Sequence, residues 1–169
     1  MNDRTQSIEL LNKAVGEELA AVHQYMYFHF RLDDLGFDLL ANLFKRTAIA
    51  EMIHIEDLAE RIFFLKGEVE MVASEGVQKI TDPDTMLRLA CEMENASVEH
   101  YNEWAIECAK HADSISKQLF EKLVADEELH FDQFETEKDN LERFGLNYLA
   151  LQSIERSKSI ATGGGKNEK

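Results

Sequence analysis

The motif E-x-x-H occurs twice in this chain, and the spacing between its two copies limits the folds open to the sequence. The copies are Glu51–His54 and Glu127–His130, 76 positions apart, and the same offset carries Glu18 onto Glu94. Residues three apart lie on one face of an α-helix, about 4.5 Å apart along its axis, so each motif directs a carboxylate and an imidazole to one point. The repeat therefore predicts two related half-chains that build one site.

Apolar residues recur with a helical period through four long segments of the sequence. The four glutamates of the repeat occupy positions that this pattern otherwise fills with Leu, Val or Phe, whereas Glu92 falls off the pattern and is expected to be solvated. Each repeated glutamate lies near the middle of its segment, so a four-helix bundle would bring all four to one height. The expected helices run from about Thr5 to Asp33, from beyond Gly36 to near Gly67, from Asp82–Pro83 to a turn at 112–114, and from there to Gly145.

The stretch from Gly67 to Asp82 has no helical period. Sixteen extended residues at about 3.3 Å each span roughly 50 Å, and a thirty-residue helix is about 45 Å long. The linker can therefore cross the bundle from end to end, which leaves the second and third helices parallel. The expected fold is all-α, an up-down-down-up four-helix bundle with this long crossover. A short C-terminal fifth helix is expected from Leu146 to about Arg156.

Length and charge narrow the possible domain organisation and partners. The chain has 169 residues and a formal net charge of −15, and we expect one domain over residues 1–157 and a flexible tail at 158–169. No basic run exceeds a pair, and the tail offers only Lys166 and Lys169, so no direct DNA binding is expected. Without an apolar stretch long enough for a membrane span, or a signal-type N-terminus, we expect a cytoplasmic protein.

Four carboxylates in an apolar core would repel one another and take up protons unless cations balance their charge. Two divalent metal ions would bring four positive charges against the four negative ones. Carboxylate and imidazole ligands suit iron, manganese or zinc. The alternative is a buried polar network that shares protons and fixes the register of the bundle. The internal repeat favours a two-metal site over that alternative.

These residues and their spacing resemble the ferritin superfamily, and most closely the bacterioferritin family. The resemblance covers nearly the whole chain, and residues 145–149 are similar to the start of the bacterioferritin fifth helix. It implies a ferroxidase that oxidises Fe(II) with hydrogen peroxide or dioxygen at a diiron site. It also implies that the protein stores iron in a hollow homo-oligomeric shell and protects the cell from oxidative stress.

The resemblance implies a complete ligand set for two iron ions per subunit. The glutamates of the two E-x-x-H motifs would bridge both metals, and each remaining Glu–His pair would complete one of them. A rival enzyme class is a rubrerythrin-type oxidoreductase, but this sequence lacks the C-x-x-C iron domain which that class needs. A purely structural bundle is the non-enzyme rival. The implied ligands are Glu18 and His54 at one iron, Glu94 and His130 at the other, and Glu51 and Glu127 between them.

Tyr25 and Met52 lie beside the ligands, and each has two interpretations. Tyr25, one heptad after Glu18, is either a core tyrosine with a satisfied hydrogen bond or an electron donor to the diiron site. Met52 points about 100° away from Glu51. The matching Met of bacterioferritins binds haem b shared across a two-fold dimer, whereas an isolated Met at an interface is ordinary packing. We favour packing for Met52 and keep haem b as the alternative.

Other aromatic residues and histidines complete the assignments. Tyr101 and Trp104 are assigned to the core or an interface. The four histidines outside the repeated motifs have no paired spacing and receive no role. They are His23, His29, His100 and His111.

Two cysteines on the third helix divide the resemblance between two branches of the superfamily. Cys91 lies one turn from Glu94, and a cysteine pair beside such a site resembles the Dps-like (thioferritin) branch, whose shells have twelve subunits rather than twenty-four. On one straight helix Cys91 and Cys108 would be about 25 Å apart, too far for a disulfide, so pairing would need a broken helix or other chains. Both are otherwise small buried hydrophobes, with a redox role for either as the alternative.

The fifth helix favours a shell of twenty-four subunits, and the cysteines and the tail after Arg156 favour twelve. We expect the Dps-like twelve-subunit shell. A haem-containing bacterioferritin of twenty-four subunits is the alternative.

Overall fold

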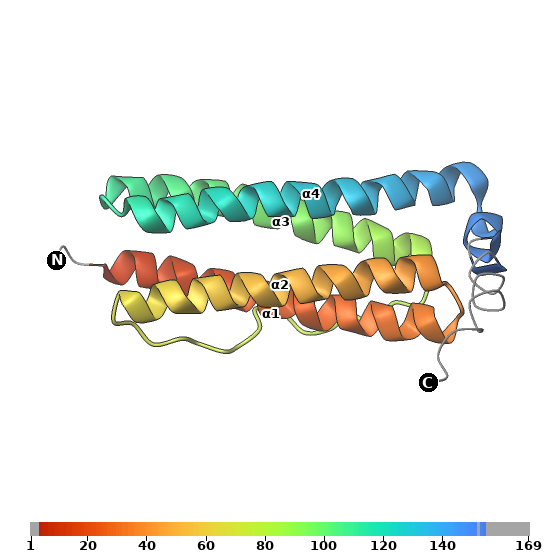
Figure 1. The fold of residues 1–169 in the computed structure, drawn as a ribbon, viewed down its shortest axis with the longest axis horizontal. Helices are drawn as coiled ribbons and strands as arrows, with labels where there is room; N and C mark the ends of the chain where they lie inside the picture. Colours follow the sequence, from red (N-terminus) through yellow and green to blue (C-terminus); the bar gives the residue numbers. More distant parts are fainter. Residues whose placement is uncertain (1–3, 152, 155–169) are drawn as a thin grey trace, which may run out of the picture.

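Four long helices form a bundle of two helical hairpins in the computed structural model, which describes residues 4–151, 153 and 154 (Figure 1). Helix α1 packs mainly against α2, and α3 packs mainly against α4. This arrangement confirms the predicted all-α fold, and each predicted helix is found within a few residues of its expected bounds. The helices are α1 (Thr5–Asp34), α2 (Asp38–Phe64), α3 (Pro83–Lys110) and α4 (Ser114–Phe144).

Short polar and glycine signals set the ends of these helices. Gly36 adopts φ of 76° directly after α1, a left-handed conformation that a residue without Cβ reaches without strain. The Asp82 carboxylate accepts a hydrogen bond of 2.9 Å from the amide of Thr85 and so caps α3. The Asp113 carboxylate caps α4 in the same way, by accepting from the amide of Ser116 at 3.2 Å.

Residues 65–82 form the crossover, which follows the length of the bundle without regular secondary structure (Figure 1). The crossover returns the chain to the end at which α2 began, so α2 and α3 run in the same direction. The up-down-down-up order predicted from the length of the linker is therefore confirmed.

A short fifth helical segment follows Gly145. Residues 146–151, 153 and 154 are helical, and Leu149 packs into the core with 1% of its surface exposed. The expected end of this helix near Arg156, the domain boundary at 157 and the tail at 158–169 lie outside the described residues. Among the helices described, none has the length and apolar character that crossing a membrane requires.

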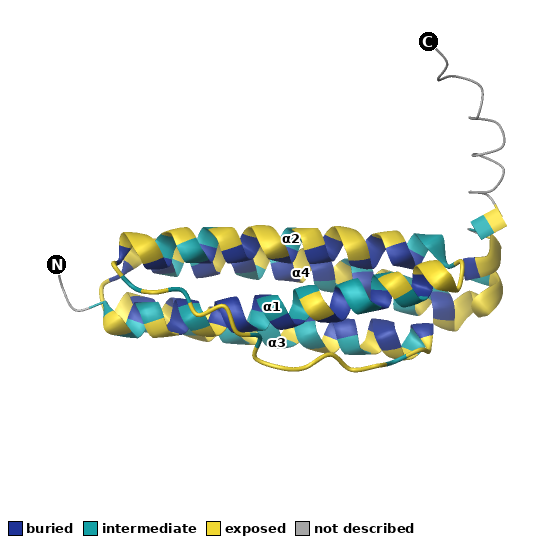
Figure 2. Ribbon diagram, turned by 90° about the horizontal axis from the view of Figure 1, so that it is seen from below, coloured by how far each residue is buried: buried dark blue, intermediate teal, exposed yellow. Residues whose placement is uncertain are grey.

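Two apolar clusters fill the bundle, one on each side of its midpoint. Tyr25, Phe44 and Phe134 belong to one cluster, and the rings of Phe44 and Phe134 lie 4.9 Å apart. Tyr101 and Phe120 belong to the other. Buried positions face inward along each helix (Figure 2). The middle of the bundle, between these clusters, is where the repeated glutamates and histidines lie, shielded from water at both ends.

Candidate metal centre

Six buried side chains converge at the middle of the bundle, one each from α1 and α3 and two each from α2 and α4. They form two groups of four whose ligand atoms lie within 4.8 Å of one another. The groups share two glutamates. One group is Glu18, Glu51, His54 and Glu127, and the other is Glu51, Glu94, Glu127 and His130.

Glu51 and Glu127 each reach both imidazoles. The Nδ1 atom of His54 lies 2.9 Å from Oε2 of Glu51 and 3.1 Å from Oε1 of Glu127. The Nδ1 atom of His130 lies 3.0 Å from Oε1 of Glu51 and 3.5 Å from Oε2 of Glu127. Each of these two glutamates therefore presents one oxygen to each half of the site, which is the geometry of a bridging carboxylate.

Glu18 and Glu94 each approach only one of the two imidazoles, as expected for ligands that bind a single metal ion. Oε1 of Glu18 lies 3.4 Å from Nδ1 of His54, and Oε2 of Glu94 lies 3.7 Å from Nδ1 of His130. The two imidazole rings stack with their centroids 5.8 Å apart. The site thus has two equivalent halves, as the 76-residue offset predicts.

The donor atoms at the centre are not satisfied by the protein. Both carboxylate oxygens of Glu51, Oε1 of Glu127 and Nδ1 of both imidazoles lack a well-oriented hydrogen bond within the described part of the chain, although they approach one another closely. Buried polar atoms without partners are costly. Oxygen and imidazole nitrogen atoms around two shared points suit two divalent metal ions. The residues present therefore fit a two-metal centre.

The pKa values of these groups show how the protein balances the charge without metal. Burial, followed by the negative charges of Glu127 and Glu51, raises the pKa of Glu18 well above its usual range. Burial and the charge of Glu51 do the same for Glu94. Burial opposes the charged form of His130, but contacts with Glu127, Glu51 and Glu94 outweigh it and raise the pKa to about 12. The metal-free site therefore holds protons.

Contacts with three carboxylates likewise overcome burial at His54 and raise its pKa. Burial alone would raise the pKa of Glu127, but contacts with His130 and His54 outweigh this effect and lower the pKa of this carboxyl. The two imidazoles and Glu127 therefore favour each other's charged forms in the metal-free site.

Two tyrosines hold the terminal glutamates. The Tyr25 hydroxyl donates a short hydrogen bond to Oε1 of Glu94, and the Tyr101 hydroxyl donates one of 2.6 Å to Oε1 of Glu18. Each tyrosine thus restrains the glutamate of the other hairpin. Tyr101 stands 76 positions after Tyr25, so the repeat contained this signal, but the sequence analysis assigned Tyr101 only to the core or an interface. The hydrogen-bonding interpretation of Tyr25 is observed, and its role as an electron donor stays a prediction.

A further carboxylate that the sequence analysis missed lies behind His54. Oδ2 of Asp126 is 3.5 Å from Nε2 of this imidazole, on the side away from the glutamates. A carboxylate behind a metal-binding histidine orients the ring and raises its basicity. No spacing rule in the sequence singles out Asp126, because its contact with His54 depends on how α4 is rotated relative to α2.

The remaining predicted residues lie outside the cluster. Met52 has 52% of its surface exposed, so it faces away from the site as expected. Cys91 and Cys108 are buried and both are free within the described chain, on an unbroken α3. Burial raises the pKa of the Cys91 thiol and that of Cys108, the latter to about 11. Glu92 is exposed, as predicted.

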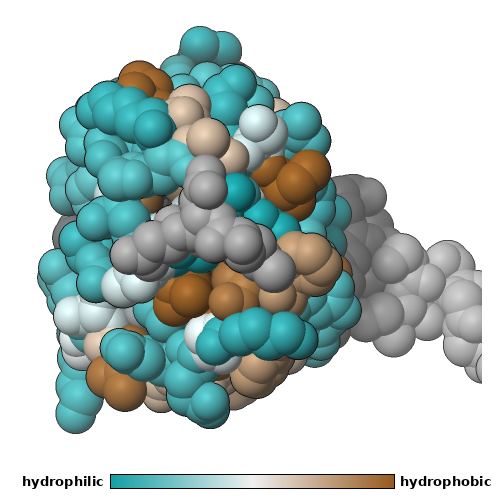
Figure 3. Space-filling view, turned by 90° about the vertical axis from the view of Figure 1, so that its left-hand side faces the viewer, coloured by the Kyte–Doolittle hydropathy of each residue, from teal (hydrophilic) through white to brown (hydrophobic). Residues whose placement is uncertain are grey.

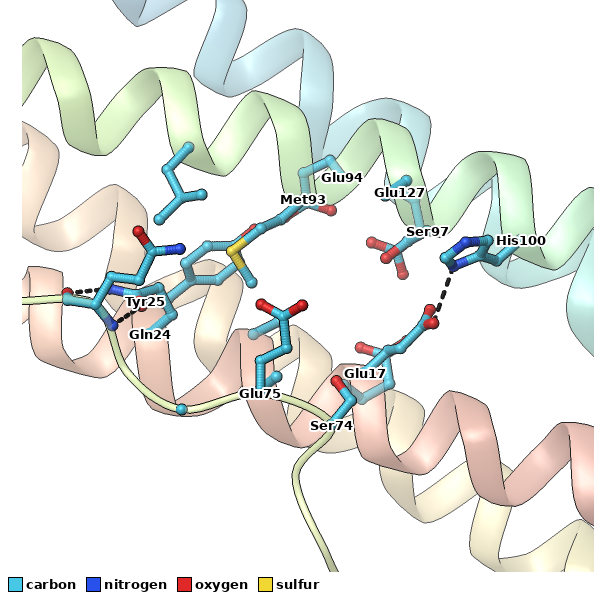
Figure 4. A pocket seen from close by; sticks show the side chains of 17 residues that line it. Glu17, Gln24, Tyr25, Ser74, Glu75, Met93, Glu94, Ser97, His100 and Glu127 are labelled. Carbon is cyan, nitrogen blue, oxygen red and sulfur yellow. Dashed lines mark hydrogen bonds and ion pairs between the residues drawn. The ribbon is translucent and has the colours of Figure 1, made fainter.

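A cavity of about 160 Å³ reaches the cluster from one side of the bundle (Figure 4). It opens between α1, α3 and the crossover. Three of the converging residues, Glu18, Glu94 and Glu127, lie on its wall. The cavity gives small ions and molecules a path from the surface to the carboxylates.

A bundle that carries one glutamate on each of two helices and a Glu-x-x-His pair on each of the other two defines the class of carboxylate-bridged two-metal proteins. The sequence matches the Ferritin-like domain family over residues 8–144. The chain therefore belongs to the ferritin family.

Curated relatives and solved structures agree with this membership. The bacterioferritin of Desulfovibrio desulfuricans is 35% identical over 153 residues, which cover 87% of this chain and 82% of that protein. The bacterioferritin of Rhodobacter capsulatus is 34% identical over 152 residues, which cover 89% of this chain and 94% of that protein. The predicted membership of the ferritin superfamily, with a bacterioferritin-like site, is confirmed.

The structures of two such bacterioferritins have the same fold. The Desulfovibrio desulfuricans structure, described with its diiron site in different catalytic states, gives a TM-score of 0.85 at 34% identity and covers 87% of this chain and 86% of that one. The Rhodobacter capsulatus structure is described with a metal-free dinuclear site and haem iron. It gives a TM-score of 0.85 at 31% identity and covers 90% of this chain and 96% of that one.

Proposed function

We propose that this protein is a ferroxidase with a diiron centre that oxidises Fe(II) for storage. The observation that carries the proposal is the position of Glu51 and Glu127, each with one oxygen at His54 and the other at His130. Two bridging carboxylates, two terminal carboxylates and two imidazoles neutralise two divalent ions in a buried site. The bacterioferritin relatives support iron as the metal.

Two ferrous ions at this centre together supply the two electrons that reduce one hydrogen peroxide, with two protons, to two water molecules. The chain's own residues hold the ions and exclude water. Glu18 and Glu94 are each restrained by a tyrosine hydroxyl, so the terminal ligands keep their orientation. The apolar clusters on both sides of the centre exclude bulk solvent. Glu51 and Glu127 would thus hold two metal ions together in a preorganised site.

Substitution of a bridging carboxylate tests this function directly. Glu127→Ala removes the ligand shared by both halves, so rapid Fe(II) oxidation should fall by at least about a hundredfold, the scale of losing an essential preorganised group. Glu128→Ala, at the exposed neighbouring position, is the matched control and should oxidise Fe(II) at the wild-type rate. Stopped-flow absorbance after mixing ferrous protein with peroxide or dioxygen measures both. Unchanged kinetics in Glu127→Ala would remove this residue from the centre.

The assembled form we propose is a homo-oligomeric shell of twenty-four subunits. The relatives are bacterioferritins, and the helical segment after Gly145 is present, whereas the expected twelve-subunit Dps-like shell finds no support among them. The cysteines that favoured the Dps-like branch are buried, and burial raises the pKa of both thiols. This is the environment of a small residue in an apolar core. Their redox role stays a prediction.

Exposed apolar side chains on the subunit are consistent with assembly. Ile49, Met52 and Ile53 on α2 are 47%, 52% and 51% exposed. Such a group on one helix face marks a protein–protein contact more often than an isolated residue does. By contrast, the end of the bundle at which α1 begins is mainly hydrophilic, with its hydrophobic atoms in separate groups (Figure 3).

Several finer properties stay predictions. Haem b at Met52 is one, supported by the exposure of this residue and by the haem iron described for the Rhodobacter capsulatus structure. The choice between peroxide and dioxygen, protection from oxidative stress, a cytoplasmic location and the lack of direct DNA binding are the others.

A further inference from the structure

A histidine and a glutamate face each other at the mouth of the cavity that leads to the metal centre. Nδ1 of His100 on α3 lies 2.9 Å from Oε1 of Glu17 on α1. The side chains are 46% and 24% exposed, so the pair is open to solvent but not fully hydrated. The His100 ring stacks on Trp104 with centroids 5.5 Å apart, which fixes its orientation. The pair is drawn in Figure 4.

The crossover adds a second carboxylate over the same cavity. The amide of Ser74 donates to the carbonyl of Gly16 at 2.9 Å, and a Cβ at Gly16 would meet the crossover backbone at 3.2 Å. Further along, Gln24 and Gln78 exchange two hydrogen bonds of 3.0 and 2.7 Å. These anchors lie on either side of Glu75, whose carboxylate points into the cavity (Figure 4).

The inner wall of this cavity belongs to the candidate metal centre. Glu127 lines the cavity with 1% of its surface exposed, and its Oε1 atom lacks a well-oriented hydrogen bond among the described residues, although Nδ1 of His54 lies 3.1 Å away. Glu17 and the terminal ligand Glu18 are consecutive on α1, and both line this cavity. The cavity thus has cation-attracting groups at its mouth and at its inner end, with no arginine or lysine among its lining residues.

We propose that Glu17 and His100 form a separate binding site for a divalent cation, which receives Fe(II) before it reaches the diiron centre. This inference rests on the proposed ferroxidase function. The carboxylate and the imidazole are ligands that suit Fe(II). Only two protein ligands meet there, so water completes the coordination and the ion exchanges readily. Glu75 contributes negative charge near the mouth, which raises the local concentration of cations.

Cobalt(II), which air does not oxidise at such a site, tests the proposal by counting ions. Under argon, calorimetric titration of the assembled protein should show three Co(II) per subunit. His100→Ala and Glu17→Gln should each show two, because the outer site is lost and the inner ligands remain. His23→Ala, an exposed histidine outside the cavity, is the control and should keep three. Circular dichroism checks that each variant is folded.

The rate at which Fe(II) fills the protein gives a second measurement. It should fall about tenfold in His100→Ala and in Glu17→Gln, within the range for loss of electrostatic guidance, and stay unchanged in His23→Ala. Crystals soaked in Co(II) should show an anomalous peak beside His100. Two ions in the wild type, three in either variant, or no peak at His100 would overturn the outer site. A wild type that binds Co(II) at His100 but does not oxidise Fe(II) would instead contradict the ferroxidase function alone.

Discussion

At the scale of residues, the four glutamates of the centre are all buried, but Glu127 differs from Glu18 and Glu94 in the direction of its pKa shift. Glu127 stands between two imidazoles, and its pKa is lowered because their contacts outweigh burial. Glu18 and Glu94 each face one imidazole, and burial together with neighbouring carboxylates raises their pKa values. Glu127 is therefore distinguished from the two terminal glutamates before any metal binds. Protons held by the terminal acids reduce the negative charge of the metal-free site.

These shifted pKa values determine how the stability of the metal-free protein depends on pH. The folded pKa is raised at Glu18 and Glu94 from 4.5, and at His130 from 6.5 to about 12. Folding therefore retains protons that the unfolded chain releases, and the stability this provides is lost as pH rises. We expect the melting temperature of the metal-free protein to fall between about pH 6 and pH 9.

Bound metal opposes this dependence, because the ions replace the protons and compete better at high pH. The Zn(II)-loaded protein should therefore be stabilised over the metal-free form by more at high pH than at low pH. Scanning calorimetry of both forms across the same pH range provides the test. A melting temperature of the metal-free protein that does not fall over this range would show that the folded site does not retain these protons.

At the scale of elements, the helices and the extent of the crossover were predictable, and the path of the crossover was not. The 3–4 spacing of apolar residues and the caps at Asp82 and Asp113 fix where each helix lies, because those signals are local. The ligand positions followed from the same spacing. The path of the crossover depends on contacts between distant segments, such as Gln24 with Gln78, which no local pattern encodes. His100 has no role until the fold brings α1 beside it.

The crossover anchors should therefore respond to a single substitution. Gln24→Ala removes both hydrogen bonds to Gln78, at a cost of about 1 kcal/mol for each. Hydrogen exchange at the crossover amides should become faster by up to roughly thirtyfold, while that of the helices stays unchanged. Gln118→Ala, at an exposed position on α4, is the control. Mass spectrometry of crossover peptides measures the exchange. Equal protection in both variants would mean that the crossover is held elsewhere.

At the scale of the whole molecule, the number of subunits is the property for which the relatives do not support our prediction from the sequence. The cysteines suggested the Dps-like branch, but neither is placed as a disulfide would require, and their burial is that of ordinary core residues. The fifth helical segment is the feature that agrees with the bacterioferritin relatives. Subunit number depends on surfaces, and a single sequence shows the pattern of the core more clearly than the fit between surfaces.

Light scattering coupled to size-exclusion chromatography decides the number directly. We expect a particle with the mass of twenty-four subunits, about twice that of a Dps-like shell. Ile53→Lys, on the exposed apolar face of α2, should shift the protein towards smaller species, because a buried lysine disfavours an interface. Glu56→Lys, at an exposed position of the same helix, is the control. A wild-type particle of twelve subunits would restore the Dps-like assignment.

At the cavity mouth, residues related by the 76-residue offset differ in type between the two halves of the chain. The offset that pairs every ligand would pair Glu17 with Met93 and His100 with Gln24, and all four line the same cavity. The first half therefore presents a carboxylate and an amide to the cavity, while the second half presents a thioether and an imidazole. The two halves of the centre are therefore alike in their ligand sets, but the residues around the cavity mouth differ between them, so the symmetry of the centre does not extend to its opening.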